Sequence, residues 1–239
     1  MSSDIQLDVL ETLEHATNYN RWIVDLALPF LGDDPLEIGS GLGYFAQGFL
    51  ELGVPRITVS ELGAGSVSNL RATFADDPRV EVRHIDIADP AELPRRHSSV
   101  IASNVLEHVE DDVAALANAG RLVGPDGRVI VYVPAFPFAM SDFDRQIGHF
   151  RRYTRARLRQ VYAAADLEIE RIRYVNAPGL LAWFVGMRLL RRTPTNQSAV
   201  RAYDRFVVPV TRRVERLAAP PFGQSLFAVG RHRRSEKGS

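Results

Sequence analysis

The sequence has no cysteine, one lysine among its 29 basic residues, and no apolar run of the roughly 20 residues that span a bilayer. Without cysteine there are no disulfides and no thiolate metal sites. This agrees with a reducing compartment, and we expect a cytoplasmic protein. Without a long apolar run, no membrane-spanning helix is predicted. The opening stretch, MSSDIQLDVLETLEH, is acidic and amphipathic, so it lacks the pattern of a secretory signal.

Net charge is zero, but the two signs are separated along the chain. Residues 1–141 carry nine arginines against 21 acidic residues, whereas residues 142–239 carry 20 basic residues against eight acidic ones. A basic C-terminal half predicts an anionic partner there. A phosphorylated or carboxylated substrate, a membrane surface and an acidic subunit all remain open, and the protein is expected to be a monomer or a homodimer.

Short apolar segments alternate with helical patterns along most of the chain. Strands are predicted at 35–39, 56–61, 79–86, 98–104, 127–134, 167–175 and 225–232, and helices at 43–53, 64–75, 110–121 and 154–165. This regular alternation predicts an α/β fold of the Rossmann-like kind, with seven mostly parallel strands and helices on both faces.

Three glycines follow the first predicted strand in the segment LEIGSGLGYF (36–45). Ligands of open α/β sheets bind at the carboxyl ends of the strands, and a glycine turn clears the backbone for them. The dinucleotide fingerprint G-x-G-x-x-G/A fails here, because its third position is Tyr44. An NAD(P)-dependent oxidoreductase is therefore only the alternative interpretation.

The same segment resembles the first motif of the class I S-adenosylmethionine (SAM) dependent methyltransferases, an acid two residues before G-x-G-x-G. The resemblance implies that Glu37 lies near the amino group of SAM. It also implies that the loop cradles the methionine part of SAM through Gly39, Ser40, Gly41 and Gly43.

Acids at the ends of the next two strands match the same family. The resemblance implies that Glu61, beside Leu62, binds the ribose hydroxyls, for which a carboxylate offers two acceptors. It implies that Asp86 and the backbone of Ile87 bind adenine. Each position also has a structural interpretation, since Glu61 could be a solvated surface acid and Asp86 a turn cap.

The fourth predicted strand ends in SNVLEHVEDD (103–112), which resembles the N-V-L-E-H segment of ubiquinone/menaquinone-type methyltransferases. The resemblance adds Asn104 to the cofactor site. His108 is interpreted as a buried histidine with a structural hydrogen bond.

The implied reaction is an in-line transfer of the methyl group of SAM to a small molecule, with S-adenosylhomocysteine as the other product. Such a transfer needs alignment and dry surroundings, and no metal is expected, because the sequence shows no clustered ligand pattern. The expected acceptor is a secondary metabolite of natural product biosynthesis. The alternative is a lipid-linked envelope precursor, methylated at the membrane surface. Nucleic acid is not expected as a substrate, since no N/D-P-P-Y/F tetrapeptide occurs.

The segment after the fifth strand, PAFPFAMSDFDRQIGHFRRYTRARL (134–158), resembles a D-x-x-x-G-H-x-R-R-Y segment of bacterial SAM methyltransferases that act on secondary metabolites or envelope precursors. His149 is the candidate catalytic base, because imidazole titrates near neutral pH. The alternative is that His149 and Asp144 bond to each other and fix this loop. The substrate-side candidates are Phe136, Asp144, Arg152 and Tyr153.

Two segments lie outside the alternating pattern. NYNRWI (18–23) resembles the N-terminal helix of the family that closes over the cofactor, and Tyr19 and Trp22 either line the substrate pocket or pack on the sheet. The segment 179–192 is apolar and then basic. Four roles are open for it: covering the substrate pocket, mediating dimerisation, lying at a membrane interface, or packing in the core.

One domain is expected, with four parts. They are a helical lid (1–29), a SAM-binding core (30–135), a substrate-side loop, helix and helical cap (136–222) and a disordered tail (233–239).

Overall fold

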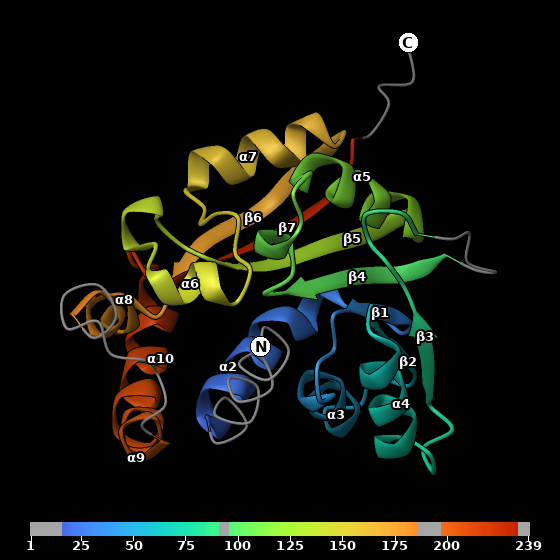
Figure 1. Ribbon diagram of the computed structural model, residues 1–239, viewed down its shortest axis with the longest axis horizontal. Coiled ribbons are helices and arrows are strands. Elements are labelled where there is room, and N and C mark those ends of the chain that lie inside the picture. Colours follow the sequence, from blue (N-terminus) through green and yellow to red (C-terminus); the bar gives the residue numbers. More distant parts are fainter. Residues whose placement is uncertain (1–15, 91–95, 186–196, 234–239) are drawn as a thin grey trace.

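The computed structural model describes residues 16–90, 96–185 and 197–233 (Figure 1). Seven strands form one sheet in the order β3-β2-β1-β4-β5-β7-β6, in which only β7 runs antiparallel to its neighbours. The strands are β1 (Pro35–Ile38), β2 (Ile57–Glu61), β3 (Val80–His84), β4 (His97–Ser103), β5 (Val123–Pro134), β6 (Leu167–Val175) and β7 (Ser225–His232). The predicted Rossmann-like α/β fold with seven strands is confirmed.

Helices cover both faces of this sheet. Figure 1 shows α5 and α7 on one face, α2, α3 and α4 on the other, and α8, α9 and α10 beyond one edge. The helices are α2 (Thr17–Ala27), α3 (Tyr44–Glu51), α4 (Ala64–Thr73), α5 (Asp112–Leu122), α6 (Asp142–Gln146), α7 (Arg155–Ala164), α8 (Ala177–Trp183), α9 (Gln197–Ala202) and α10 (Val208–Leu217).

The alternation of side chains along each strand divides the core into two hydrophobic layers. On β5, Val129 and Val131 pack with α5 and α7, while Ile130 and Tyr132 pack with α2 and α3. This is the period of two that a pleated strand imposes, and it explains why central strands buried on both faces read as continuous apolar runs.

The observed element boundaries differ by a few residues from those predicted from the hydrophobic pattern, and for α5 a capping residue explains the difference. The helix predicted from residue 110 begins at Asp112, because the Asp111 side chain accepts the Ala114 N–H and stops the turn there. β5 begins four residues earlier than predicted, where Val123 pairs with His97. Residues 1–15 of the expected helical lid, residues 186–192 of the apolar and basic segment, and the tail after residue 233 lie outside the described residues.

The sheet order places the carboxyl ends of β2, β1, β4 and β5 side by side. The chain crosses over between β1 and β4, which makes this the switch point at which ligands of open α/β sheets bind. The three glycines, Glu61, the segment 103–108 and the loop after β5 therefore meet at one edge.

The packing of the protein itself explains why two of the three positions are glycine. A Cβ on Gly39 would lie 2.6 Å from Cγ2 of Val105, and a Cβ on Gly43 would lie 2.6 Å from Cε2 of Phe74. Both glycines also have a left-handed φ, +68° and +86°. The expectation that these side chains are absent to admit a ligand is thus incomplete, because protein atoms already occupy the space.

Replacing Gly39 by alanine should destabilise the protein by about 3 kcal/mol, from overpacking against Val105 together with the left-handed backbone. Gly53→Ala isolates the backbone part, since Gly53 has φ +93° with open space around it. Gly65→Ala has neither problem and lies within α4, so it should stabilise by up to about 1 kcal/mol. Chemical denaturation measures all three, and equal effects at Gly39 and Gly53 would contradict the packing argument.

Candidate active site

The glycine loop is a tight turn that joins β1 to α3. Gly43 donates its N–H to the Ser40 carbonyl at 2.8 Å, and Gly41 donates its N–H to Oε1 of Glu61 at 2.6 Å. The Ser40 hydroxyl faces the protein, where it accepts the Ser60 N–H at 3.2 Å. The loop therefore offers backbone groups rather than the Ser40 side chain to a ligand.

Glu37 is a fully buried acid at the end of β1. Neither of its carboxylate oxygens has a hydrogen-bond partner of normal geometry in the described part of the chain. The pKa of Glu37 is raised to about 8, chiefly by burial; the Ser40 hydroxyl partly opposes the rise, and the charge of Glu61 adds to it. A buried carboxylate without a donor is unfavourable unless a cation or donor comes to it, so Glu37 fits the amino group of SAM.

Glu61 lies at the end of β2 with its carboxylate already anchored to the loop. Burial raises its pKa, and hydrogen bonds from the N–H groups of Gly41 and Leu62 oppose that rise. A carboxylate has about four acceptor positions, so the anchored group still has capacity for ribose hydroxyls. The side chain of Leu62 is exposed.

The adenine-side candidates occupy the ends of β3 and β4. Oδ1 of Asp86 accepts the Ala88 N–H at 2.9 Å, which is the turn-capping role expected as the alternative. The Ile87 side chain is buried, and its carbonyl accepts Nδ2 of Asn118 at 2.8 Å. Asn104 is exposed in a left-handed conformation, with φ +54°. Their contacts with adenine stay predictions.

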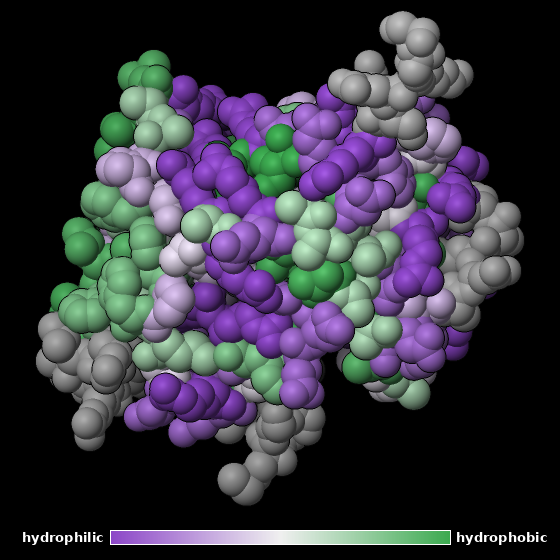
Figure 2. Space-filling view, turned by 90° about the horizontal axis from the view of Figure 1, so that it is seen from above, coloured by the Kyte–Doolittle hydropathy of each residue, from purple (hydrophilic) through white to green (hydrophobic). Residues whose placement is uncertain are grey.

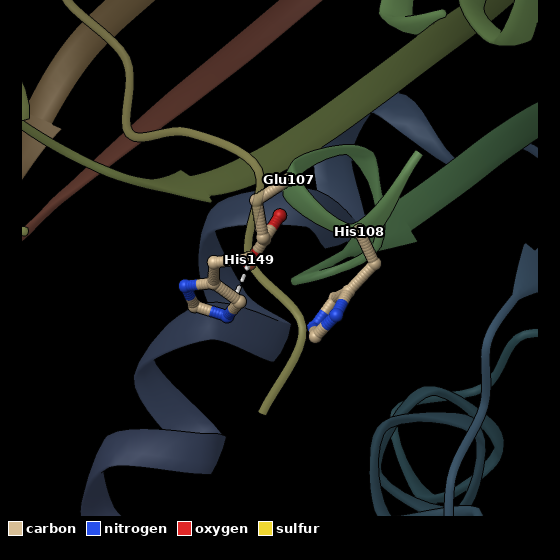
Figure 3. Close-up of side chains that lie close together, drawn as sticks. All are labelled: Glu107, His108 and His149. Atoms are coloured by element: carbon tan, nitrogen blue, oxygen red, sulfur yellow. Dashed lines mark ion pairs between the residues drawn. The ribbon is translucent and has the colours of Figure 1, made fainter. Parts of the chain in front are cut away.

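A second cluster of ionisable groups adjoins the glycine loop through Val105. Figure 3 shows Glu107 and His108, from η2 (Leu106–His108), facing His149 from the loop after α6. Nε2 of His149 lies 3.9 Å from Oε1 of Glu107, and the two imidazole rings meet edge to face with centroids 4.6 Å apart. Sequence analysis missed this cluster because its segments are distant in the chain, although an E-H pair at the end of β4 was visible.

Burial dominates the electrostatics of this cluster. It raises the pKa of Glu107 to about 8 and lowers the pKa of His108 to about 4, with His149 as the second cause for His108. The Glu107 oxygens, like those of Glu37, find no hydrogen-bond partner within the described ranges. At neutral pH, His108 is therefore uncharged and Glu107 is largely protonated.

Asp144 orients His149 from the other side. Nδ1 of His149 lies 3.0 Å from Oδ1 of Asp144, and Nη2 of Arg152 lies 2.8 Å from the same oxygen. Burial opposes ionisation of Asp144, but the hydrogen bonds from His149, Arg152 and Ser141 together with the charge of Arg152 outweigh it, so the pKa lies well below its ordinary value. Because the Asp144 carboxylate is ionised, Nδ1 of His149 is the donor of this hydrogen bond, and Nε2 faces Glu107 instead.

The cluster has two chemical uses. One is proton acceptance at Nε2 of His149, with Asp144 holding the ring. The other is metal binding, because Glu107, His108 and His149 offer two nitrogens and one oxygen within 4.8 Å of one another. That donor set suits a divalent transition metal, and a carboxylate on the far nitrogen of a ligand histidine is common at such sites.

Several other substrate-side candidates make contacts that the fold itself needs. The Tyr153 hydroxyl is buried on the Leu106 carbonyl and Asp112, and the Arg152 guanidinium stacks on Trp183 at 4.7 Å. Trp22 is buried in the layer under β5. These contacts give the three side chains a structural role, and their contact with substrate stays a prediction.

Two aromatic candidates, Phe136 and Tyr19, pack against the two opposite hydrophobic layers of the core. The half-buried ring of Phe136 stacks on Tyr174 with centroids 4.8 Å apart, and its backbone has φ +63°. The Tyr19 hydroxyl lies 2.6 Å from that of Tyr132, and burial raises the pKa of Tyr19. Phe136 and Phe138 pack together and give the loop after β5 an apolar wall.

Three arginines of the substrate-side loop and the start of α7, Arg151, Arg152 and Arg157, are paired within the protein. Arg157 bonds both oxygens of Asp112 at 2.7 and 2.9 Å, and Arg151 donates to the Val109 carbonyl at 2.9 Å. Arg151 and Arg152 were expected either to neutralise an anionic substrate or to pair with acids of the first half of the chain. Arg151 pairs with Asp112 of that half, whereas Arg152 pairs with Asp144 of the second half.

Comparison with known proteins places these motifs in a family. A family model described as a methyltransferase domain matches residues 12–172. A protein of Mycolicibacterium smegmatis, whose name assigns it to the S-adenosylmethionine-dependent methyltransferases, is 29% identical over 161 residues, which are 65% of this chain and 58% of that protein. The chain spans about half the length of the curated relatives it matches.

Solved structures agree on the fold. One is described as the Haloferax volcanii Trm112 methyltransferase activator in complex with a methyltransferase; it is 19% identical, covers 98% of this chain and 97% of its own, and has a TM-score of 0.65. Another is an O-methyltransferase from neocarzinostatin biosynthesis with S-adenosylhomocysteine and 1,4-dihydroxy-2-naphthoic acid, 23% identical over 69% of this chain and 52% of its own, with a TM-score of 0.53. These comparisons favour the methyltransferase prediction over the oxidoreductase alternative.

Proposed function

Because the chain belongs to the class I SAM-dependent methyltransferases, we propose that it transfers the methyl group of SAM to a small molecule, a secondary metabolite, in a desolvated pocket at the carboxyl edge of the sheet. The observation that carries the proposal is Glu37, a fully buried acid beside a left-handed glycine loop, whose carboxylate oxygens have no hydrogen-bond partner among the described residues. The small-molecule acceptor is supported by the O-methyltransferase from neocarzinostatin biosynthesis, whose structure contains a naphthoic acid.

Four groups of this chain would hold SAM. The Glu37 carboxylate receives the amino group, the backbone of the loop from Gly39 to Gly43 encloses the methionine part, Glu61 binds the ribose and Asp86 binds the adenine. When bound, SAM supplies a methyl group on a sulfonium, which its positive charge already activates as an electrophile.

His149 is the proposed proton acceptor. Its Nδ1 is committed to Asp144 at 3.0 Å, so a proton from the acceptor would bind at Nε2. Phe136 and Phe138 would exclude water from that side. Because the methyl group needs no further activation, the proposal includes no metal, and elemental analysis of the purified protein tests this against the metal-binding use of the same cluster.

Affinity for S-adenosylhomocysteine should rise with pH. The folded protein keeps a proton on Glu37 up to about pH 8, whereas the amino group of the ligand favours the carboxylate. Binding below pH 8 must then release that proton, so each unit from pH 6 to 8 should strengthen binding by up to about tenfold. Calorimetry measures this, with Glu37→Gln as the matched variant, which should bind weakly at every pH. The same pH dependence in Glu37→Gln would refute the role of Glu37.

Glu61→Ala should weaken SAM binding by about 10- to 100-fold, because it removes charged hydrogen bonds to the ribose and releases Gly41. Glu51→Ala is the matched control, since that exposed acid lies at the end of α3, away from the loop. Calorimetry with S-adenosylhomocysteine and with NADH compares the ligands directly. Unchanged affinity in Glu61→Ala, or tight binding of NADH alone, would contradict the assignment.

A further inference from the structure

The helical elements at one edge of the molecule form a continuous helix from Gln197 to Leu217. They are α9, the π-helical turn η5 (Tyr203–Val207) and α10. Both acids of this stretch point inward. Asp204 accepts the N–H groups of Asn18 and Tyr19 at 3.0 and 2.9 Å, and Glu215 accepts the Ala177 N–H at 2.9 Å. The outer surface of the helix therefore carries no exposed acid.

An apolar stripe runs along the outside of this helix. It consists of Phe206, Val210, Val214 and Leu217, whose exposed fractions are 68%, 58%, 59% and 90%. Their spacing of four, four and three residues places them on one face. Figure 2 shows that hydrophobic residues also gather at the left edge of the molecule, on the side where α6 and α8 lie above α10 in Figure 1. Single exposed apolar residues are ordinary, but a stripe on one helix face indicates an interaction surface.

Arginines border the stripe. Arg205, Arg213 and Arg216 form no ion pair with any residue in the described ranges, whereas Arg212 pairs with Asp25. A cavity of about 230 Å³ lies against α10, and three of its six lining residues are arginines. It is lined by Asn18, Val208, Pro209, Arg212, Arg213 and Arg216. Guanidinium groups around a small cavity are suited to a phosphate group.

We propose that the helix 206–217 docks the protein on an anionic lipid bilayer, with the apolar stripe in the headgroup region and Arg213 and Arg216 on lipid phosphates. An amphipathic helix with arginines beside a large apolar face is typical of interfacial binding. A nucleic acid would use the arginines but leave the stripe in water. No helix in the described part of the chain is long and apolar enough to cross a membrane.

Vesicle flotation tests the docking without relying on catalysis. The purified protein is mixed with vesicles of phosphatidylcholine alone, or of phosphatidylcholine with phosphatidylglycerol, at low and at high salt. The proposal expects flotation with the anionic vesicles that weakens at high salt and little flotation with phosphatidylcholine alone. Absence of flotation with anionic vesicles would overturn it.

Two double variants separate the parts of the surface. Arg213→Glu with Arg216→Glu should weaken partitioning at least about tenfold, because each arginine near an anionic surface contributes roughly a factor of five. Val210→Ser with Val214→Ser should weaken it by a similar factor. The matched control is Arg71→Glu with Arg159→Glu, exposed arginines on α4 and α7 that make the same change in net charge.

Each remaining outcome decides for or against the bilayer. Loss of flotation only in the two surface variants, with melting temperature and S-adenosylhomocysteine binding retained, supports it. Equal loss in the control would show a general charge effect and overturn it. A dimer in sedimentation that Val210→Ser with Val214→Ser dissociates, without vesicle binding, would assign the stripe to a second copy. Displacement from vesicles by DNA, with the stripe variant unaffected, would assign the arginines to nucleic acid.

Discussion

His149→Ala should lower turnover by about 100- to 10,000-fold while leaving affinity for SAM within about twofold, the range expected when a positioned base is removed. The reason is geometric. Asp144 holds Nδ1 of His149 at 3.0 Å, which leaves Nε2 as the proton acceptor, and no cofactor-side group depends on this ring. Release of S-adenosylhomocysteine measures turnover, and calorimetry measures affinity.

Added imidazole provides the control for this variant. If His149 acts as a base, imidazole should restore part of the lost rate, whereas it would not repair a misplaced loop. If the cluster instead binds a metal, a different experimental result is expected. Stoichiometric metal in the wild-type protein, lost together with activity in His149→Ala and on chelation, would contradict the base and assign Glu107, His108 and His149 to a metal.

Asp144→Asn should destabilise the protein by about 3 to 5 kcal/mol, the usual effect of breaking a buried ion pair. The substitution leaves the Arg152 guanidinium without its carboxylate, and that side chain is only 2% exposed. It also weakens the capping box in which Asp144 accepts the Ser141 N–H at 2.6 Å. Asp142→Asn is the matched control, because its side chain is 83% exposed and should change the unfolding free energy by less than about 0.5 kcal/mol.

The pH dependence of unfolding gives a second measurement on Asp144. Its folded-state pKa is lowered, so the stability it contributes is present above the unfolded value of about 3.9 and is lost as pH falls below it. The wild-type protein should therefore lose its advantage over Asp144→Asn in acid. If Asp144→Asn does not fold, adding Arg152→Met should restore folding by removing the unpaired cation. A constant difference at all pH values would contradict the ion-pair account.

The cofactor half could be predicted from the sequence because its signals are local. An acid, a glycine turn and further acids at successive strand ends keep their spacing however the rest of the chain folds. Once the sheet order is known, Gly41 and Glu61 must approach each other, and the structure joins them at 2.6 Å. The strands were also predictable, because central ones such as β5 contain a continuous apolar run and the edge strands β3 and β6 alternate apolar with charged residues.

The second cluster could not be predicted in the same way. Glu107 and His149 come together only because the loops after β4 and β5 meet at the sheet edge, and no periodicity records that contact. The same holds for the packing of Val105 against Gly39 and for the bond between Asn18 and Asp204. The sequence left open whether Trp22 lines the substrate pocket or packs on the sheet, and the structure buries its side chain in the core. Burial depends on tertiary packing, which the sequence pattern leaves open.

Transfer of a labelled methyl group tests the central claim most directly. The protein is incubated with SAM carrying a trideuterated methyl group and with a bacterial small-molecule extract, and products are identified by mass spectrometry. The account predicts a small molecule that carries all three deuterium atoms with the wild-type protein, and far less of it with His149→Ala. Tight binding of S-adenosylhomocysteine without transfer to any small molecule, or label found only in macromolecules, would contradict it.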